Sequence, residues 1–317
     1  MKENILVVTT GFTDRQIEKL REFCQENDCV FNLATSYAEA EPFLPEATII
    51  YGGSAKVIAN APKLKWFHSG SAGVNTYIPV LKEETILTNS SGAYGLSIAE
   101  HLIMVTLMLL RKMPVYQEII RNRSWKYKFQ LDSLYGQRIT VLGTGDIGGN
   151  FARRAKAFLP YSLFGVNRSG RQAEPFDKCY PVSQLDEILP ETSLLVCCIP
   201  ETPETISLIN RERIALLPDG ARIVNVGRGS LIDEDALIEA LNSGKLAGAA
   251  LDVFRKEPLP QDSPLYDTPN LIMTPHCSGN MTVDYTIETN FNIFYTNLKH
   301  YFSDEPLEHV VNKKLGY

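Results

Sequence analysis

The chain lacks the features that usually identify membrane, nucleic-acid-binding or disulfide-rich proteins. Its longest apolar run, residues 102–110, is far shorter than the roughly 18 residues that a membrane-spanning helix needs. With 31 Lys and Arg against 37 Asp and Glu, the formal net charge is −6, so no basic excess attracts nucleic acid or an anionic membrane. The first residues also lack a signal-peptide layout. We therefore expect a cytoplasmic protein with no nucleic-acid or membrane partner.

The six cysteines, at positions 24, 29, 179, 197, 198 and 277, include no Cys-x-x-Cys pair. Neither a zinc site nor a disulfide framework is indicated, and no bound metal is expected. Cys197 and Cys198 lie in an apolar run typical of a buried parallel strand, so we interpret them as small core residues. Cys277 adjoins a candidate catalytic histidine and is a residue to test for reactivity, although no base that would activate it is evident.

Short apolar strands alternate with helical patterns along the whole chain, which predicts a parallel α/β architecture. The length of 317 residues is enough for two domains. Strands are expected near residues 5–9, 30–33, 48–51, 64–68, 86–88, 138–142, 161–166, 194–198, 222–226, 248–251 and 271–273. Helices are expected over residues 14–24, 97–112, 147–159, 233–242 and 282–302.

The last expected helix is long enough to return to the first domain. The sequence therefore predicts two Rossmann-like parallel-sheet domains, with a dinucleotide-binding domain inserted into a flavodoxin-like substrate domain. The substrate domain is expected to comprise residues 1–97 and 286–317, and the dinucleotide-binding domain residues 98–285. A cleft between the two is expected to hold the substrate.

The most informative local pattern is an apolar strand that runs into Gly143-Thr-Gly-Asp-Ile-Gly148. Glycines at this spacing allow a tight turn, backbone approach to a pyrophosphate and close helix packing, and the next helix points its N–H groups at the phosphates. The spacing alone is a weak signal, but the flanking strand and helix complete a βαβ unit. We predict a dinucleotide site that includes Gly143, Thr144, Gly145, Asp146, Ile147 and Gly148.

The end of the next expected strand bears on which dinucleotide is bound. NAD sites usually place Asp or Glu there to bind the ribose 2′-hydroxyl, whereas this chain has Asn167-Arg-Ser-Gly-Arg171. Guanidinium, hydroxyl and amide groups can bind a 2′-phosphate that a carboxylate would repel. Asn167, Arg168, Ser169 and Arg171 therefore favour NADP (as NADPH), with NAD possible. The alternative is a solvated loop with loose cofactor choice.

Three further segments, residues 225–229, 251–260 and 274–279, follow strands of the second domain, where open parallel sheets place ligands. Arg228 lies between two glycines just after a strand. Glu257 and His276 each adjoin a proline that restrains the local backbone. Each of these residues alone is more often structural or solvated than catalytic, so only their combination carries weight.

With Ser71-Ala-Gly-Val74, Thr88-Asn-Ser-Ser-Gly92, Ala99-Glu-His101 and Pro200-Glu-Thr-Pro-Glu-Thr205, these segments resemble the D-isomer-specific 2-hydroxyacid dehydrogenases over nearly the whole chain. The resemblance implies that His276 is the acid/base, Glu257 its partner and Arg228 the substrate-binding arginine. The implied reaction is NAD(P)H-dependent reduction of a small 2-keto acid, of the glyoxylate or hydroxypyruvate type, to the D-2-hydroxy acid.

The chemistry itself calls for these residue types. Reduction of a 2-keto acid needs a hydride donor, a proton donor for the developing alkoxide, and a cation for the carboxylate and carbonyl oxygens. Histidine suits the proton role because its ordinary pKa, about 6.5, lies near neutral pH. A carboxylate such as that of Glu257 would favour and orient the imidazolium. Arg228 can hold a carboxylate through two parallel hydrogen bonds.

The resemblance also implies contacts beyond these three residues. The backbone N–H groups of Ala72 and Gly73 are expected to bind the substrate carboxylate, and Gly53 and Ser54 are a second candidate because small residues after a strand leave amides exposed. Asp252 is expected to orient the nicotinamide carboxamide, with a strand-end cap as the alternative. The other implied cofactor contacts are Ile199, Pro200, Thr202, Thr205, Val226 and Gly227.

Other functions remain open. One is an NAD-dependent D-3-phosphoglycerate or other D-2-hydroxyacid dehydrogenase, expected in a short form because Tyr317 follows soon after the last helix. A dinucleotide-sensing corepressor-type binding protein would use the same scaffold. Formate dehydrogenase is disfavoured, because that relative has Gln where Glu257 stands. We also expect a homodimer, in which residues 99–110 and an arm at 116–135 carrying Trp125 form the interface, unless these segments are simply core.

Overall fold

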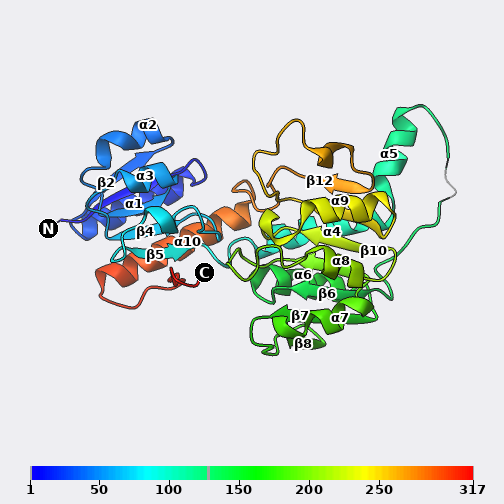
Figure 1. Ribbon diagram of the computed structural model, residues 1–317. Helices are drawn as coiled ribbons and strands as arrows, with labels where there is room; N and C mark the ends of the chain where they lie inside the picture. Colours follow the sequence, from blue (N-terminus) through cyan, green and yellow to red (C-terminus); the bar gives the residue numbers. More distant parts are fainter. Residues whose placement is uncertain (1, 127–128, 317) are drawn as a thin grey trace. The chain divides into compact units, whose positions relative to one another are not determined.

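The computed structural model describes residues 2–126 and 129–316. The chain divides into two compact units, Met1–Tyr94 with Asn280–Tyr317 and Gly95–Gly279, which we call the first and the second unit (Figure 1). The chain thus passes from one unit to the other twice, after Tyr94 and before Asn280. The roles that the sequence suggests for the two units stay predictions.

The first unit is built on a five-stranded parallel sheet in the order β2-β1-β3-β4-β5. This is the flavodoxin-like order. Successive residues of a strand pack on opposite faces of the sheet, so that Leu6 and Ile50 join one apolar cluster and Ile5 and Ile49 the other. The strands are β1 (Asn4–Val8), β2 (Val30–Ala34), β3 (Ile49–Gly52), β4 (Trp66–Ser69) and β5 (Ile86–Asn89), and the helices are α1 (Asp14–Glu26), α2 (Tyr37–Ala40), α3 (Ala55–Ala59) and α10 (Asp284–Phe302).

The second unit contains a seven-stranded parallel sheet in the order β12-β11-β10-β9-β6-β7-β8. Its strands are β6 (Arg138–Leu142), β7 (Ser162–Asn167), β8 (Lys178–Pro181), β9 (Leu194–Cys197), β10 (Ala221–Asn225), β11 (Leu246–Leu251) and β12 (Leu271–Met273). The strand order reverses between β6 and β9, and ligands of such sheets bind outside the carboxyl ends of the strands at this point. The predicted fold class, two Rossmann-like parallel-sheet domains, is confirmed.

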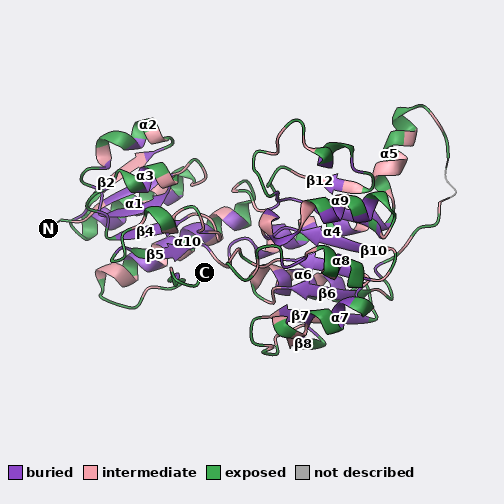
Figure 2. Cartoon of the chain, viewed as in Figure 1, coloured by how far each residue is buried: buried purple, intermediate pink, exposed green. Residues whose placement is uncertain are grey.

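The helices of the second unit have exposed outer faces, whereas most residues of its strands are buried (Figure 2). They are α4 (Gly95–Leu110), α5 (Met113–Arg121), α6 (Asp146–Lys156), α7 (Leu185–Ile188), α8 (Arg211–Leu216) and α9 (Glu234–Asn242). Short 3-10 segments occupy Glu41–Phe43, Ile78–Val80, Val182–Gln184, Leu189–Glu191, Gly229–Leu231 and Pro264–Asp267. Within the described ranges, no helix is long and apolar enough to cross a membrane.

Several boundaries differ from the expected ones. The helix expected over 97–112 ends at Leu110, because Lys112 has a left-handed φ of 53°. The helix expected over 147–159 ends at Lys156, and Leu159, with a φ of 53°, precedes Pro160. The first part of the expected arm is helix α5, Trp125 of that arm is 83% exposed, and residues 127 and 128 lie outside the described part of the chain.

Candidate active site

The glycine turn after β6 requires glycine at its first and last positions. Gly143 has a φ of 101°, and a Cβ there would lie 2.9 Å from the carbonyl oxygen of Cys198, just after β9. A Cβ on Gly148 would lie 1.9 Å from the Gly143 oxygen, so only glycine lets α6 start this close to the strand. A Cβ on Gly145 would meet nothing within 4 Å. The turn therefore has the features of a dinucleotide turn, with open space at its middle glycine and the N-terminus of α6 behind it.

Asn167, at the end of β7, organises the loop that follows. Its Nδ2 donates to Thr144 Oγ1 (3.1 Å) and to the Arg171 carbonyl (2.8 Å), and its Oδ1 accepts from the Ser169 N–H (3.3 Å). Arg168, Ser169 and Arg171 are exposed, and residues 167–171 include no carboxylate. The pattern fixes the loop backbone against the glycine turn and leaves two guanidinium groups and a hydroxyl on the surface.

The loops after β9 and β10 pack against each other beside the glycine turn. A Cβ on Gly227 would lie 2.6 Å from the Ile199 carbonyl oxygen, and the Val226 N–H donates to Cys197 (3.1 Å). Thr205 Oγ1 accepts from the Thr202 N–H (2.7 Å) and donates to the Pro200 carbonyl (2.9 Å). The structure therefore brings the implied cofactor residues 199–205 and 226–227 together at the carboxyl ends of two neighbouring strands.

Hydrogen bonds from Asn225 fix the backbone around Arg228. Asn225 accepts from the Gly227 N–H (3.0 Å) and donates to the Arg228 carbonyl (2.9 Å). Burial lowers the pKa of the Arg228 guanidinium, and the charges of Glu201 and Glu257 oppose that shift. Sequence reasoning missed both Asn225 and Glu201, although a polar residue that ends a buried strand was a usable signal for Asn225. Arg228 is thus a largely desolvated cation with two carboxylates in its vicinity.

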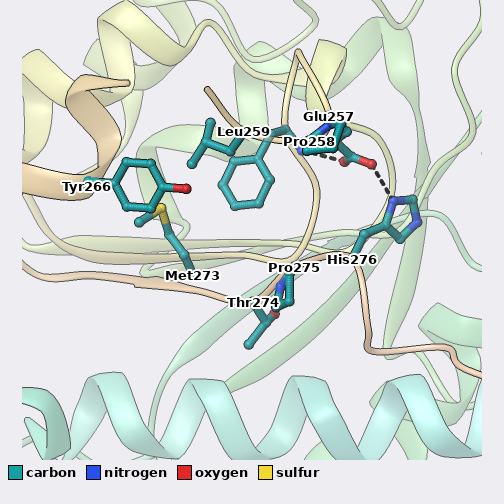
Figure 3. A pocket seen from close by; sticks show the side chains of 9 residues that line it. Glu257, Pro258, Leu259, Tyr266, Met273, Thr274, Pro275 and His276 are labelled. Carbon is teal, nitrogen blue, oxygen red and sulfur yellow. Dashed lines mark hydrogen bonds and ion pairs between the residues drawn. The ribbon is translucent and has the colours of Figure 1, made fainter. Parts of the chain in front are cut away.

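Glu257 and His276 form a hydrogen-bonded pair, as Figure 3 shows. Glu257 Oε2 lies 2.6 Å from His276 Nδ1, and Oε1 accepts from the Phe254 N–H (2.8 Å). The carboxylate is therefore held at both oxygens. The His276 side chain is 50% exposed, and in the described ranges no protein group bonds its Nε2. Because Nδ1 is committed to Glu257, Nε2 is the ring nitrogen left to exchange a proton with a ligand.

Asp252, at the end of β11, holds the loop that carries His276. Its Oδ1 accepts from Thr274 Oγ1 (2.6 Å) and the Cys277 N–H (2.9 Å), and its Oδ2 accepts from the Ser278 N–H (3.0 Å) and hydroxyl. His276 itself has a φ of 52°, a strained conformation for a non-glycine residue. These contacts are those expected if Asp252 acts as a strand-end cap. Its role in orienting the nicotinamide carboxamide stays a prediction. The contacts of Thr274 and Ser278 with Asp252 could not be predicted from the sequence.

An apolar pocket of about 660 Å³ adjoins the pair. Tyr266 and Met273 lie along it, and His276 and Glu257 lie at one end of the group of side chains drawn in Figure 3. The remaining lining residues are Phe254, Pro258, Leu259, Thr274 and Pro275.

Cys277 is exposed, and desolvation together with the charge of Asp252 raises the pKa of its thiol, which disfavours the thiolate. Among the described residues, no group of three or more His, Cys, Asp or Glu could hold a metal ion.

In the first unit, the loop of residues 70–73 after β4 has every carbonyl engaged but leaves the Ala72 and Gly73 amides open. The Ala72 carbonyl accepts from Asn89 Nδ2 (2.8 Å) and the Gly73 carbonyl from Ser71 Oγ (2.8 Å). Over the described residues, the Ala72 and Gly73 N–H groups donate to no protein acceptor. Successive free amides of this kind suit an anion. The other donors to the loop carbonyls are Tyr94 and Asn290 (to Gly70) and Ser69 and Ser90 (to Ser71).

The second candidate pair, Gly53 and Ser54, follows β3, the strand next to β4. The Gly53 carbonyl accepts from Tyr77 Oη (3.2 Å), and exposed Ser54 is the residue before the short helix α3. Both residues therefore lie at the same edge of the first sheet as residues 70–73. Over the described residues their N–H groups, like those of Ala72 and Gly73, donate to no protein acceptor.

Comparison with known proteins identifies the family. Residues 103–278 match the model of the D-isomer specific 2-hydroxyacid dehydrogenase, NAD binding domain. Glyoxylate/hydroxypyruvate reductase B of Pectobacterium carotovorum is 34% identical over 86% of this chain and 88% of its own length. Among solved structures, a D-isomer specific 2-hydroxyacid dehydrogenase family protein from Aeromonas salmonicida has a TM-score of 0.87 and 33% identity, covering 99% of this chain and 100% of its own.

A second solved structure is the NADPH-dependent glyoxylate/hydroxypyruvate reductase of Sinorhizobium meliloti in complex with NADP and sulfate. It has a TM-score of 0.84 and 27% identity, and the match covers all of both chains. The resemblance noted in the sequence motifs is confirmed by these matches. The chain belongs to the D-isomer specific 2-hydroxyacid dehydrogenase family and is an NAD(P)-dependent oxidoreductase.

Proposed function

We propose that this enzyme reduces a small 2-keto acid of the glyoxylate or hydroxypyruvate type to the D-2-hydroxy acid and prefers NADPH. The observation that carries the proposal is the Glu257–His276 pair, in which Nδ1 is held at 2.6 Å and Nε2 is left for a ligand. The relatives from Pectobacterium carotovorum and Sinorhizobium meliloti are named for this chemistry.

In the proposed mechanism, the cofactor supplies the hydride when bound. His276 Nε2 donates the proton to the developing alkoxide, and the Glu257 carboxylate stabilises the imidazolium that precedes this transfer. Arg228 binds the substrate carboxylate and carbonyl oxygens, and its partial desolvation strengthens that attraction. The N–H groups of Ala72 and Gly73 bind the carboxylate as well.

We further propose that the 2′-phosphate of NADPH is bound by Arg168, Ser169 and Arg171. Two exposed guanidinium groups and a hydroxyl follow β7, where an NAD site would place a carboxylate. Charge-assisted hydrogen bonds to a phosphate are among the stronger polar contacts in proteins. The glycine turn and residues 199–205, 226 and 227 would then hold the rest of the dinucleotide.

We also propose a homodimer. Several large apolar side chains of α4, α5 and the following arm are exposed, among them Met104, Ile120 and Trp125. A contact between two copies would remove this surface from water. Light scattering at micromolar concentration should give twice the mass of the chain, and a monomer mass would contradict the proposal.

A turnover assay tests the proposed function. We expect NADPH oxidation with glyoxylate and with hydroxypyruvate. The product from hydroxypyruvate should be D-glycerate. Only this substrate reports the stereochemistry of the reaction, because glycolate, the product from glyoxylate, has no stereocentre. Faster turnover of 3-phosphohydroxypyruvate with NADH would instead favour a phosphoglycerate dehydrogenase. Binding of NADPH without oxidation by any member of a broad 2-keto acid panel would favour a dinucleotide-sensing binding protein.

A further inference from the structure

Asn290, on α10 of the first unit, is fully buried and uses both ends of its side-chain amide. Its Oδ1 accepts from Tyr51 Oη (2.9 Å) and Ser90 Oγ (2.6 Å). Its Nδ2 lies 3.0 Å from the Gly70 carbonyl oxygen and 3.0 Å from Tyr94 Oη. A buried amide that is fully bonded fixes the groups around it, because losing one partner leaves another without a hydrogen bond.

The Gly70 carbonyl is the first peptide group of the loop whose Ala72 and Gly73 amides are open. Two donors hold it, since Tyr94 Oη also donates to this oxygen. The Gly70 carbonyl and the Ser71 N–H share one peptide plane, so fixing the oxygen fixes the direction in which the loop starts. Asn290 is 220 positions away from Gly70 in the sequence, whereas the Ser71 N–H of the same peptide donates to its near neighbour Ser69 Oγ (3.2 Å).

The same side chain contacts the segments that lead to the second unit. Tyr94 is the last residue of the first unit before the chain leaves it, and Met281 is the second residue after the chain returns. Asn290 Nδ2 lies 3.4 Å from Met281 Sδ, in addition to its bond to Tyr94. One amide therefore ties the loop and both crossing segments to helix α10.

The groups that surround Asn290 are neutral. His68 Nε2 lies 3.1 Å from Ser90 Oγ, and burial lowers the pKa of this imidazole to about 3. Burial raises the pKa of the Tyr51 and Tyr94 hydroxyls, which keeps both protonated. A network without a charge holds its geometry by the directions of its hydrogen bonds, so deleting one donor or acceptor disturbs the loop rather than its electrostatics.

We propose that Asn290 is a positioning residue of the substrate site, which holds the Gly70 carbonyl so that the Ala72 and Gly73 amides stay available to a carboxylate. The proposal rests on the function proposed above for that loop. Asn290 acts through the loop and does not touch the substrate. Its loss should therefore weaken binding of the keto acid more than it slows the chemical step.

The variants Asn290→Ala and Tyr94→Phe test this role. We expect Asn290→Ala to raise the KM for hydroxypyruvate about tenfold, as the loss of one or two buried hydrogen bonds implies, while kcat falls less than about threefold. Tyr94→Phe removes a single hydroxyl and should raise KM about threefold. The Kd of NADPH, measured by fluorescence titration, should stay unchanged in both variants, because the cofactor residues lie in the second unit.

Asn297→Ala is the matched control. Asn297 lies on the same helix, is also fully buried, and bonds the Glu308 backbone at both ends (3.0 and 2.7 Å); among the described residues it makes no hydrogen bond to residues 70–73. Its loss should lower stability by a similar amount with KM unchanged. Equal increases of KM in the Asn290 and Asn297 variants, or a KM within twofold of wild type for Asn290→Ala, would overturn the proposal. If Asn290→Ala does not fold, an unchanged KM in Tyr94→Phe is by itself enough to overturn the proposal.

Calorimetric titration with oxalate separates this inference from the proposed function. Oxalate presents a carboxylate to the loop whether or not the enzyme reduces a keto acid. We expect the NADPH complex of the wild type to bind oxalate and Asn290→Ala to bind it about tenfold more weakly. Weakened binding supports the positioning role even if no keto acid is reduced. Equal binding by both proteins, or no binding by the wild type, refutes it.

Discussion

Two loops of the molecule, residues 70–73 after β4 and residues 274–278 after β12, are held by different means. Neutral donors hold the first: the side chains of Asn89, Tyr94 and Asn290 reach its carbonyls. A buried carboxylate holds the second, since Asp252 accepts four hydrogen bonds from it. The first loop offers open amides, and the second presents a titratable imidazole.

Under the proposed function, this difference separates substrate binding from proton transfer. A carboxylate beside residues 70–73 would repel the anion that the open amides suit, so neutral supports are what that loop needs. The loop with His276 has to hold a strained backbone and a side chain that changes charge, and a fixed carboxylate stabilises both. Substitutions in the second loop should therefore act mainly on kcat, and those in the first mainly on KM.

The largest effect is expected from His276→Gln, which removes the proton donor. The kcat for hydroxypyruvate should fall about 10²- to 10⁴-fold, the range for loss of a general acid, while the Kd of NADPH stays within about threefold. Stopped-flow NADPH oxidation and fluorescence titration measure the two quantities. His300→Gln is the control, because His300 also pairs with a glutamate (Glu305, 3.5 Å) but lies in the first unit. Comparable loss of cofactor binding would argue against the acid role.

Asp252→Asn should give the next largest effect. An amide cannot accept from four donors, and its NH₂ group would meet donors of Cys277 or Ser278. We expect a loss of about 2–3 kcal/mol in the free energy of unfolding and a fall in kcat of about 10- to 100-fold. Urea unfolding and steady-state kinetics check both values. In the control, Asp219→Asn removes an exposed carboxylate that pairs with Lys245 (2.8 Å) and should change neither. A change in KM alone would break the contrast between the loops.

The double change Arg168→Asp and Ser169→Ala should alter cofactor choice without touching either loop. The ratio of kcat/KM with NADPH to that with NADH should fall about 10- to 100-fold, because a carboxylate repels the 2′-phosphate and binds a ribose hydroxyl. Arg211→Ala, at an exposed arginine that pairs with Glu239, should leave the ratio unchanged. Preference of the wild type for NADH would show that our interpretation of residues 167–171 is wrong.

The smallest effect is expected from pH, acting on His68 in the neutral network that supports residues 70–73. The unfolded chain protonates His68 below about pH 6.5, whereas burial, together with the charge of His309, lowers the pKa in the fold to about 3. Acid therefore favours the unfolded chain between these values, and stability is fully present only above about pH 6.5. Going from pH 7.5 to 5.5 should cost the wild type about 1 kcal/mol through this group, and His68→Gln should remove that part of the loss. Urea unfolding at both pH values measures this loss. If the free energy of unfolding falls equally in the wild type and in His68→Gln, the lowered pKa of His68 is contradicted.

The sequence predicted the strands of both sheets well because most are short apolar runs buried on both faces. The edge strand β8 was missed, since Lys178-Cys-Tyr-Pro181 has neither an apolar run nor clear alternation. Helix α5 was missed because it begins soon after α4 ends. The two are separated at Lys112, whose left-handed backbone conformation could not be predicted from the sequence. These failures are local and leave the strand order intact.

The site divides in the same way. Gly143, Gly148 and the pairing of Glu257 with His276 could be predicted, because motif spacing and family resemblance specify them. The roles of Asn290 and Ser278 could not, since the first acts on a carbonyl 220 positions away and the second on a carboxylate 26 positions away. Such contacts form only after folding has brought distant segments together within each unit.

The central claim is that the open amides of Ala72 and Gly73 bind the substrate carboxylate and that His276 donates the proton. Nitrogen-15 NMR of the NADPH complex, titrated with oxalate, tests it directly. We predict that the amide signals of Ala72 and Gly73 and the ring nitrogens of His276 shift together and fit a single Kd. A response confined to one of the two loops, or two clearly different Kd values, would contradict the account.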